Sequence, residues 1–550
     1  MDNTPTAGRT APDWLRWPPE AAARYRSAGY WGDEPLGDIP RRQAALRPTH
    51  TALVDGERRW SYAALAAETD RISRALRGLG LTRGDRVIVQ LPNIAEFVLV
   101  WFALQRLGAV PIHAMPGHRR SEISHLARLT DAVAYVVPDR HARFDHRELA
   151  AEIRQAANAV RQVIVVGERG DHRDAVSFAD LRHANPAPES PSSPAADPGP
   201  DAGDLALLLL SGGTTGTPKL IPRTHRDYAY NARAAAEICG LGPDSVYLAV
   251  LPAAFNFTLS CPGILGTLHA GGTVVLAPNP SPVTAFELIA RERVTITAVN
   301  PPLVPHWLAE CRESRPDLSS LRVLQVGAAR LPDELARRIE PELGCRLQQV
   351  FGMAEGLLNL TRLDDPDALV HTTQGRPISP ADEVLVVDRA GRPVPDGEVG
   401  ELLTRGPYTL RGYYRSPGHA DTHFTPDGHY RTGDLVRRLP SGHLRVVGRV
   451  KDQINRGGEK IDATEVEEHL LAHPAVTAAA VVAAPDPALG ERSVAFLVCT
   501  GPPPTARELA AFLRARGLAG YKAPDRVEAV PELPLTPVGK IDKKALRARP

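Results

Sequence analysis

Residues 211–219 read Ser-Gly-Gly-Thr-Thr-Gly-Thr-Pro-Lys, and they follow directly on the apolar run Leu205–Leu210. That run has the length and composition of a short buried strand. Glycines let backbone N–H groups approach an anion closely, threonine hydroxyls add donors, and Lys219 adds a positive charge. The stretch therefore predicts a polyphosphate-binding loop after a strand. Its order of residues differs from that of the Walker loop, in which the lysine directly follows a glycine.

The chain as a whole has the composition of a large globular protein. Its 550 residues exceed what one hydrophobic core normally supports, so we expect at least two domains. Lys and Arg number 65 and Asp and Glu 64, a balance that offers no electrostatic footprint for nucleic acid or an anionic membrane. Five scattered cysteines favour a reducing compartment. With no signal-peptide pattern at the start, we expect a cytoplasmic protein.

Alternation of apolar runs with helical patterns predicts the fold class. Strand candidates at 85–90, 246–251, 273–276, 294–299 and 321–326 alternate with helices, which favours α/β architecture with covered sheets. Residues 97–115 are apolar, but Gln105, Arg106 and His113 interrupt them, so they read as a buried helix and strand and not as a membrane span. Residues 185–204, rich in Pro, Ala and Ser, predict a surface linker.

The last hundred residues have a different pattern. A helix at 463–472, strands at 476–482 and 493–498, and a helix at 505–517 predict a small α+β domain. The junction is expected at 448–452. We therefore divide the chain into an N-terminal domain, residues 1–449, and a C-terminal domain, residues 450–550.

Further motifs follow the phosphate loop in a fixed order. They are Phe-Gly-Met-Ala-Glu at 351–355 after a predicted strand, Tyr-Arg-Thr-Gly-Asp at 430–434 after a turn, Gly-Arg at 448–449 and Pro-Val-Gly-Lys at 537–540. Together they resemble the adenylate-forming superfamily of acyl-CoA synthetases, adenylation domains of nonribosomal peptide synthesis and luciferases. The resemblance covers nearly the whole chain. It implies a large N-terminal α/β adenylation domain with a β-barrel subdomain, and a small mobile C-terminal domain.

Three stretches narrow the resemblance to the aryl-acid AMP ligases of siderophore assembly. They are residues 348–366, the segment Lys-Asp-Gln-Ile-Asn-Arg-Gly-Gly-Glu-Lys at 451–460, and the opening from Trp17-Pro18-Pro19 to Tyr30-Trp31. This subgroup implies attack of an aryl carboxylate on the α-phosphate of ATP, with Mg²⁺, to give aryl-AMP and pyrophosphate. The acyl group then passes to the phosphopantetheine thiol of a separate aryl carrier protein.

The resemblance carries roles to individual residues. Lys540 is the adenylation lysine, Glu355 a catalytic residue and Mg²⁺ ligand, and Asp434 the acceptor of ribose hydroxyls. Phe351 stacks on adenine or, equally, lies in a core. The residues expected to bind ATP are Ser211, Gly212, Gly213, Thr214, Thr215, Gly216, Lys219, Ala329, Arg330, Val350, Phe351, Gly352, Asp434 and Arg449.

A second set of residues belongs to the thiol-transfer step that the resemblance implies. The C-terminal domain rotates about a hinge at Lys451, for which a plain linker lysine is the alternative. After rotation a loop replaces Lys540 and lines a channel for the thiol. Its residues are Gly457, Gly458, Glu459 and Lys460.

The acid itself is predicted from a third set. The residues expected to bind it are Phe255, Asn256, Phe257, Cys261, Gly327, Ala328, Met353, Ala354 and Leu358. Asn256 matches the residue that meets the ortho hydroxyl and carboxylate of aryl acids. Relatives that use 2,3-dihydroxybenzoate carry Ser and Val where this chain has Cys261 and Leu358. Cysteine is a weak hydrogen-bonding partner and leucine adds bulk, which favours salicylate.

One departure and two competing functions remain open. Phe255 stands where the subgroup usually has histidine, which keeps anthranilate or a substituted salicylate as alternatives beside 2,3-dihydroxybenzoate. An aryl-CoA ligase that uses free coenzyme A is the nearest other enzyme. A non-catalytic binding protein of the same fold would be expected to lack the loop lysine, Glu355 or Lys540, and all three are present.

Overall fold

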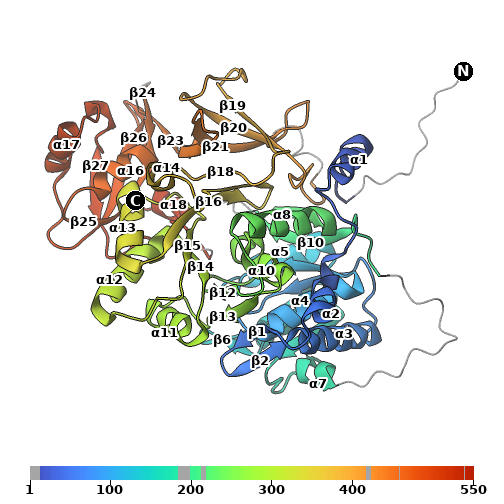
Figure 1. Ribbon diagram of the computed structural model, residues 1–550. Coiled ribbons are helices and arrows are strands. Elements are labelled where there is room, and N and C mark those ends of the chain that lie inside the picture. Colours follow the sequence, from blue (N-terminus) through green and yellow to red (C-terminus); the bar gives the residue numbers. More distant parts are fainter. Residues whose placement is uncertain are drawn as a thin grey trace, which may run out of the picture.

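The computed structural model describes residues 13–183, 199–211, 219–416, 423–456, 459–537 and 539–549. In the described residues the sheets are two large ones, a four-stranded sheet, a five-stranded C-terminal sheet and a two-stranded ribbon of β6 (Arg140–His141) and β7 (Phe144–Asp145) (Figure 1). Residues 212–218 of the predicted phosphate loop, Gly457 and Gly458 of the thiol-transfer loop, and most of the predicted linker lie outside the described ranges.

The phosphate-loop sequence connects two strands of a seven-stranded sheet. The sheet has the order β11-β10-β4-β3-β5-β8-β9, and its strand pairs are parallel except β10 with β11. Residues 211–219 are therefore the connection of an antiparallel hairpin. The strands are β3 (Arg86–Val89), β4 (Val110–His113), β5 (Ala134–Pro138), β8 (Gln162–Val166), β9 (Val176–Ser177), β10 (Leu205–Leu210) and β11 (Leu220–Thr224).

A nine-stranded sheet has the order β18-β17-β16-β15-β14-β12-β13-β1-β2. Its central strands are parallel, and β2, β17 and β18 pair antiparallel at the two ends. The strands are β1 (Thr51–Asp55), β2 (Arg58–Ser61), β12 (Val246–Ala249), β13 (Thr273–Leu276), β14 (Ile296–Val299), β15 (Val323–Val326), β16 (Arg346–Met353), β17 (Leu357–Leu360) and β18 (Arg376–Pro377).

Helices between and outside these sheets build the cores. One hydrophobic cluster joins side chains of both large sheets through a shared helical layer, in which α4 is apolar on nearly all sides because sheets cover both of its faces. The helices of this layer are α2 (Ile39–Leu46), α3 (Tyr62–Gly78), α4 (Ala95–Leu107), α8 (His225–Ile238) and α10 (Gly263–Ala270).

The outer faces of the two large sheets are covered separately. The seven-stranded sheet packs against α5 (Arg120–Thr130) and α6 (His146–Ala156). The nine-stranded sheet packs against α11 (Pro282–Glu292), α12 (Val304–Ser314) and α13 (Asp333–Leu343). The remaining helices before residue 400 are α1 (Pro19–Ser27), α7 (Phe178–His183), α9 (Asn256–Ser260) and α14 (Asp367–Thr372). The architecture is the predicted α/β type with covered sheets.

The expected β-barrel subdomain corresponds to an antiparallel four-stranded sheet of order β19-β20-β21-β22. Its strands are β19 (Glu383–Val387), β20 (Val399–Arg405), β21 (Tyr430–Arg438) and β22 (Leu444–Arg449). The motif at 430–434 follows a turn, as we expected: the Gly428 N–H donates to the Thr425 carbonyl at 2.8 Å just before β21 begins. The motif itself forms the first half of β21. Phe351, Gly352 and Met353, which we expected to follow a strand, are instead the end of β16. A short motif does not reveal which of its residues pair with a neighbouring strand.

The C-terminal region forms its own sheet and two cores, and lies beside α13 and the four-stranded sheet (Figure 1). After the short 3₁₀ turn Val450–Asp452 come β23 (Gln453–Arg456), β24 (Glu459–Asp462), α16 (Ala463–Leu471), β25 (Val476–Asp486), β26 (Gly490–Cys499), α17 (Ala506–Ala515), β27 (Arg526–Ala529) and α18 (Lys543–Arg547). A Thr505–Glu508 capping box begins α17. Among the residues described, none of the helices has the length and apolarity that crossing a bilayer requires.

At Gly375 the backbones of the nine-stranded and the four-stranded sheet approach closely: the Gly375 carbonyl accepts from the Leu444 N–H at 2.8 Å. Its φ is +81°, and a Cβ there would overlap the backbone of Leu360 and Thr361. Gly391 has a similar φ of +78° but open space around it. Left-handed backbone costs a residue with a Cβ about 1–2 kcal/mol.

We expect Gly375→Ala to lower the free energy of unfolding by more than about 4 kcal/mol, because overlap adds to the backbone strain. Gly391→Ala is the control and should cost about 1–2 kcal/mol. Urea unfolding followed by tryptophan fluorescence measures both. Equal losses in the two variants would show that the crossing at Gly375 is not close.

Candidate active site

The two ends of the predicted phosphate loop are fastened to each other. The Ser211 N–H donates to the Lys219 carbonyl at 2.9 Å, and the Lys219 N–H donates to the Ser211 hydroxyl at 3.2 Å. The Lys219 ammonium donates to His423 Nε2 at 2.7 Å and lies 4.8 Å from the centre of the Tyr413 ring. This places the loop's lysine beside the Glu355 motif.

Glu355 lies just after β16 and is 8% exposed. The Tyr413 hydroxyl donates to its Oε1 at 3.1 Å, and the Leu410 N–H donates to its carbonyl at 2.8 Å. Burial raises the pKa of Glu355, and the charges of Arg449 and Lys540 oppose that rise. A buried carboxylate needs hydrogen bonds and opposite charge, which Tyr413, Arg449 and Lys540 provide here.

Asp434 and Arg449 form an ion pair across two strands. They occupy opposite positions of β21 and β22, and Arg449 Nε lies 2.7 Å from Asp434 Oδ1. Asp434 is buried, and burial raises its pKa while Arg449 and Lys540 lower it. The register of the sheet thus brings together the two motif residues that were expected to contact the ribose and phosphates.

Lys540 reaches this cluster from the C-terminal domain. Its loop is tightened by the Thr536 N–H, which donates to the Lys540 carbonyl at 2.7 Å. Asn300 of the N-terminal domain donates to the Gly539 carbonyl at 3.1 Å and fixes the loop from the other side. Burial lowers the pKa of Lys540 to about 8; Arg449 adds to this effect, and Asp434 and Glu355 oppose it.

Seven of the nine residues predicted to bind the acid belong to one hydrophobic cluster or pack against it. Phe257, Cys261 and Leu358 are buried members of it, and Phe255, Ala328, Met353 and Ala354 pack against it. The Phe255 and Phe257 rings meet edge to face at 6.4 Å. Burial raises the pKa of the Cys261 thiol to about 12, so this sulfur is neutral. Substituting the usual histidine by Phe255 therefore extends an apolar edge-to-face pair.

The connection after β15 approaches this cluster through its backbone. A Cβ at Gly327 would lie 2.8 Å from the Val350 carbonyl and 3.0 Å from the Phe257 ring, so glycine is required. Ala328 has a φ of +70°, the left-handed region that glycine prefers. Arg330 instead turns to the domain interface, where its guanidinium pairs with Asp333 and with Glu468 of α16. The backbone of this connection thus lines the acid cluster, while the Arg330 side chain joins the two domains.

Phe351 lies at a boundary between a core and the candidate nucleotide site. It is partly buried and packs against the cluster of Leu357, Val386, Leu402, Val436 and Leu444. Both sequence interpretations, an adenine platform and a core residue, are compatible with this position.

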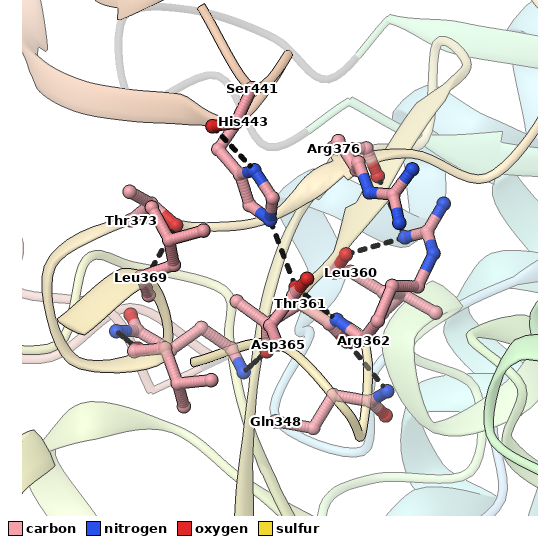
Figure 2. A network of polar contacts seen from close by, with 12 residues as sticks. Gln348, Leu360, Thr361, Arg362, Asp365, Leu369, Thr373, Arg376, Ser441 and His443 are labelled. Carbon is pink, nitrogen blue, oxygen red and sulfur yellow. Dashed lines mark hydrogen bonds and ion pairs between the residues drawn. The ribbon is translucent and has the colours of Figure 1, made fainter. Parts of the chain in front are cut away.

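A network of hydrogen bonds connects the β16–β17 hairpin to neighbouring segments of the chain (Figure 2). Asp365 accepts from the Arg362 N–H at 2.6 Å and from His443 Nε2 at 2.9 Å. Gln348 donates to the Thr361 carbonyl at 2.9 Å. Because His443 lies in the turn between β21 and β22, the network ties the hairpin that carries Leu358 to the strands that carry Asp434 and Arg449.

The expected hinge falls on the 3₁₀ turn between the two domains. Lys451 is the middle residue of that turn, and Arg547 of α18 donates to the neighbouring Asp452 at 2.7 Å. Glu459 begins β24, and the backbone of Lys460 pairs with that of Asn455 in β23.

Several residues of the cluster escaped the sequence analysis. Tyr413, His423 and Asn300 reach it from loops distant in sequence, and no local signal marks them. Arg223 could have been found, because it directly precedes Thr-His-Arg-Asp at 224–227, a sequence typical of a helix capping box that follows a strand. Arg223 Nε lies 2.5 Å from Asp227 Oδ1 and its Nη1 donates to the Ala354 carbonyl at 3.1 Å, both side chains being fully buried.

The fold brings charged motif residues of the large N-terminal region close to Lys540 of the small C-terminal region. The AMP-binding enzyme family model matches residues 40–414, and the AMP-binding enzyme C-terminal domain model matches residues 465–540. The 2,3-dihydroxybenzoate-AMP ligase of Bacillus subtilis is 52% identical over 533 residues, 96% of each chain. The salicyl-AMP ligase / salicyl-S-ArCP synthetase of Mycobacterium tuberculosis is 48% identical over 548 residues, 98% of this chain and 95% of that one.

Solved structures agree with these matches. The apo structure of MbtA from Mycobacterium smegmatis has a TM-score of 0.75 and 48% identity, and the match covers 98% of this chain and 99% of that chain. This chain belongs to the AMP-binding enzyme family. Its resemblance to the aryl-acid AMP ligases is confirmed, because relatives with such names match along nearly the whole chain.

The buried Arg223–Asp227 pair generates a stability prediction. Arg223→Met leaves the Asp227 charge buried without its partner, so we expect the free energy of unfolding to fall by about 3–5 kcal/mol. Adding Asp227→Asn removes that charge but keeps an acceptor for the Thr224 N–H, and should recover part of the loss. Urea unfolding of the single and double variants measures the difference. A double variant less stable than Arg223→Met would contradict a charge-based cost.

Proposed function

We propose that this protein activates an aryl acid with ATP, forming aryl-AMP and pyrophosphate, and then transfers the acyl group to the phosphopantetheine thiol of an aryl carrier protein. One observation carries the proposal. Lys540 of the small domain is half-buried and lies close enough to Arg449, Asp434 and Glu355 of the large domain for their charges to alter its pKa. Relatives named as 2,3-dihydroxybenzoate-AMP and salicyl-AMP ligases support the class of acid.

The chemistry joins two anions, so catalysis depends on positioning and on neutralising charge. The charges of Asp434, Glu355 and Arg449 all act on the Lys540 ammonium and shift its pKa. In the reaction it would donate hydrogen bonds to the acid carboxylate and an α-phosphate oxygen together. Charge that develops on the phosphorus oxygens in the transition state would then meet a fixed cation in a site that excludes water.

The nucleotide would lie across the ends of several strands. In this proposal the backbone from Ser211 to Gly216 and the Lys219 ammonium hold the β- and γ-phosphates. Asp434 accepts hydrogen bonds from the ribose hydroxyls and remains paired with Arg449. Phe351 faces adenine, with Val350 and Gly352 beside it, and the backbone of Ala329 and Arg330 closes the base side.

A magnesium ion fits beside Glu355. Among the described residues no three acidic, imidazole or thiol side chains gather into a metal site by themselves. Mg²⁺ that accompanies a nucleotide needs only one or two protein carboxylates, because phosphates and waters complete its octahedron. Glu355, buried and close to Lys219, provides such a ligand. Bound there, the ion would neutralise phosphate charge.

Salicylate is the acid we favour. The neutral Cys261 thiol offers a 3-hydroxyl only a weak partner, and Leu358 packs against Gly352, where a Cβ would lie 2.8 Å from its Cδ1. Leaving a buried hydroxyl without a good partner costs about 1–3 kcal/mol. The site therefore discriminates against 2,3-dihydroxybenzoate without any repulsive charge.

The second half-reaction requires Lys540 to leave. We place the boundary between the domains at 449/450 and the hinge at Lys451, where the 3₁₀ turn separates β22 from β23. Rotation would break the Asn300–Gly539 and Arg330–Glu468 contacts and bring the Gly457–Lys460 segment to the acyl-AMP. Such a domain movement is a common gating step in enzymes.

Acid-dependent ATP–pyrophosphate exchange tests the proposed function. We expect exchange with salicylate to exceed that with 2,3-dihydroxybenzoate, anthranilate and benzoate. Lys540→Ala should lower the exchange rate by about 10²–10³-fold, because it removes a cation that acts in the transition state. Lys543→Ala is the matched control, since Lys543 pairs with Glu467 outside the cluster. Absence of exchange with every aryl acid would refute the function, and a preference for the dihydroxy acid would refute the choice of salicylate.

The lowered pKa of Lys540 predicts a pH profile. The reaction needs the ammonium, which is lost as the pH rises through its pKa of about 8 in the free enzyme. We expect kcat/KM for ATP to fall above that pH. At saturating ATP the phosphate charge raises the pKa of Lys540, so the fall in kcat should move to higher pH. Lys540→Arg keeps its charge and should lack the fall near pH 8. A wild-type profile that is flat to pH 10 would contradict this assignment.

A further inference from the structure

Asn256 is the polar side chain among the residues assigned to the acid, and the structure fixes which way its amide faces. The Tyr228 hydroxyl lies 2.7 Å from Asn256 Oδ1. The amide nitrogen has the Cys261 sulfur at 3.8 Å, which is a weak acceptor. An amide can be reversed without changing its shape, so this orientation needs an independent reason.

That reason is a chain of buried hydrogen bonds that begins at a backbone carbonyl. Asn231 lies 2.6 Å from the Ser260 carbonyl oxygen, which can only accept, so the Asn231 group there is its NH₂. The same nitrogen donates to the Ser260 hydroxyl oxygen at 3.1 Å. Ser260 is therefore left with its own proton to donate, and its hydroxyl stabilises the Tyr228 phenol oxygen as an acceptor, which opposes the rise that burial causes in the pKa of Tyr228.

Tyr228 in turn sets the orientation of the Asn256 amide. Its oxygen accepts from Ser260, and its single proton is directed to Asn256 Oδ1. Tyr228 is completely buried, with the Arg223 guanidinium 4.9 Å from its ring centre, so it has no water to exchange partners with. One Asn256 N–H is directed at the weakly accepting Cys261 sulfur, and the other is then available to a bound molecule.

We infer that Asn231, Ser260 and Tyr228 form a hydrogen-bond relay that holds the Asn256 amide with its available N–H toward the acid, and that this relay selects a 2-hydroxy over a 2-amino aryl acid. The inference rests on the proposed function. In salicylate the hydroxyl proton is shared with the neighbouring carboxylate, and the hydroxyl oxygen can accept from Asn256. In anthranilate the nitrogen lone pair is delocalised into the ring, and the amino group presents N–H donors to the N–H donor of Asn256.

Tyr228, Ser260 and Asn231 are thus positioning residues that act through Asn256. Donor facing donor leaves two buried polar groups without partners, which sites built for a hydrogen bond discriminate against strongly. The relay adds selectivity at the ortho position, which the Cys261 and Leu358 side chains do not control.

The test compares salicylate and anthranilate in ATP–pyrophosphate exchange, with benzoate as the acid that lacks an ortho group. We expect Tyr228→Phe to lower the ratio of kcat/KM for salicylate to that for anthranilate by about tenfold. The benzoate value and KM for ATP should change little. Ser260→Ala should lower the ratio in the same direction by a smaller factor.

Two further variants separate selectivity from folding. Tyr135→Phe is the matched control, because Tyr135 is also buried and its hydroxyl donates to the side-chain amide oxygen of Gln90, away from the site. It should leave the ratio unchanged. Asn256→Asp replaces the donor by an acceptor of equal shape, so it should lower activity with both acids and move the ratio toward anthranilate even if Tyr228→Phe folds poorly.

The outcomes are distinguishable. Exchange by the wild type that prefers salicylate, with the ratio lowered in Tyr228→Phe and Asn256→Asp but not in Tyr135→Phe, supports the relay. A wild-type preference for anthranilate, or a ratio that neither site variant changes, overturns the relay and leaves the proposed function standing. No exchange with any aryl acid overturns both.

Discussion

The candidate site depends on how it stabilises opposite charges that lie close together. Lys540, Arg449, Asp434 and Glu355 lie close enough to alter one another's pKa; the two carboxylates are buried, Lys540 is half-buried and the Arg449 side chain is 43% exposed. The buried carboxylates alone would be costly in such a place, and the nearby cations offset that cost. The cations come from two different domains, so the charge balance exists only when the small domain lies against the large one. Binding of an anionic nucleotide would add to the same balance.

The sheets determine where these charges meet. Asp434 and Arg449 face each other because β21 and β22 pair in that register, and Glu355 follows the end of β16. The Asp365–His443 contact links the hairpin of β16 and β17 to the turn between β21 and β22 (Figure 2). Strands and polar contacts thus fix Glu355, Asp434 and Arg449 at the candidate nucleotide site, while Lys540 belongs to a separate domain. Such a division suits a reaction in two steps, in which one catalytic group has to be replaced by a thiol.

The candidate acid site combines apolar walls with a small number of oriented polar groups. Phe255, Phe257 and Leu358 provide apolar contact area, which does not fix the orientation of a ligand. The Asn256 amide contributes little area but offers directional hydrogen bonds. Its orientation comes from Tyr228, Ser260 and Asn231, none of which we placed among the acid-binding residues from the sequence. Selectivity for the ring substituent can therefore reside in residues that do not touch the acid.

The sequence by itself determined the fold class, the order of the motifs and the family, because strand periodicity and the residues at 211–219, 351–355, 430–434 and 537–540 are local signals. The buried helix and strand predicted within 97–115 are α4 and β4, whereas residues 351–353, expected to follow a strand, are the end of β16, since pairing partners distant in sequence decide strand ends. Only the tertiary structure decided that Arg330 joins the two domains and that Arg223 is buried against the distant Ala354 carbonyl. It also brought Tyr413, His423 and Asn300 to the cluster and fixed the Asn256 amide. These outcomes depend on contacts between segments far apart in the chain, which local residue patterns do not encode.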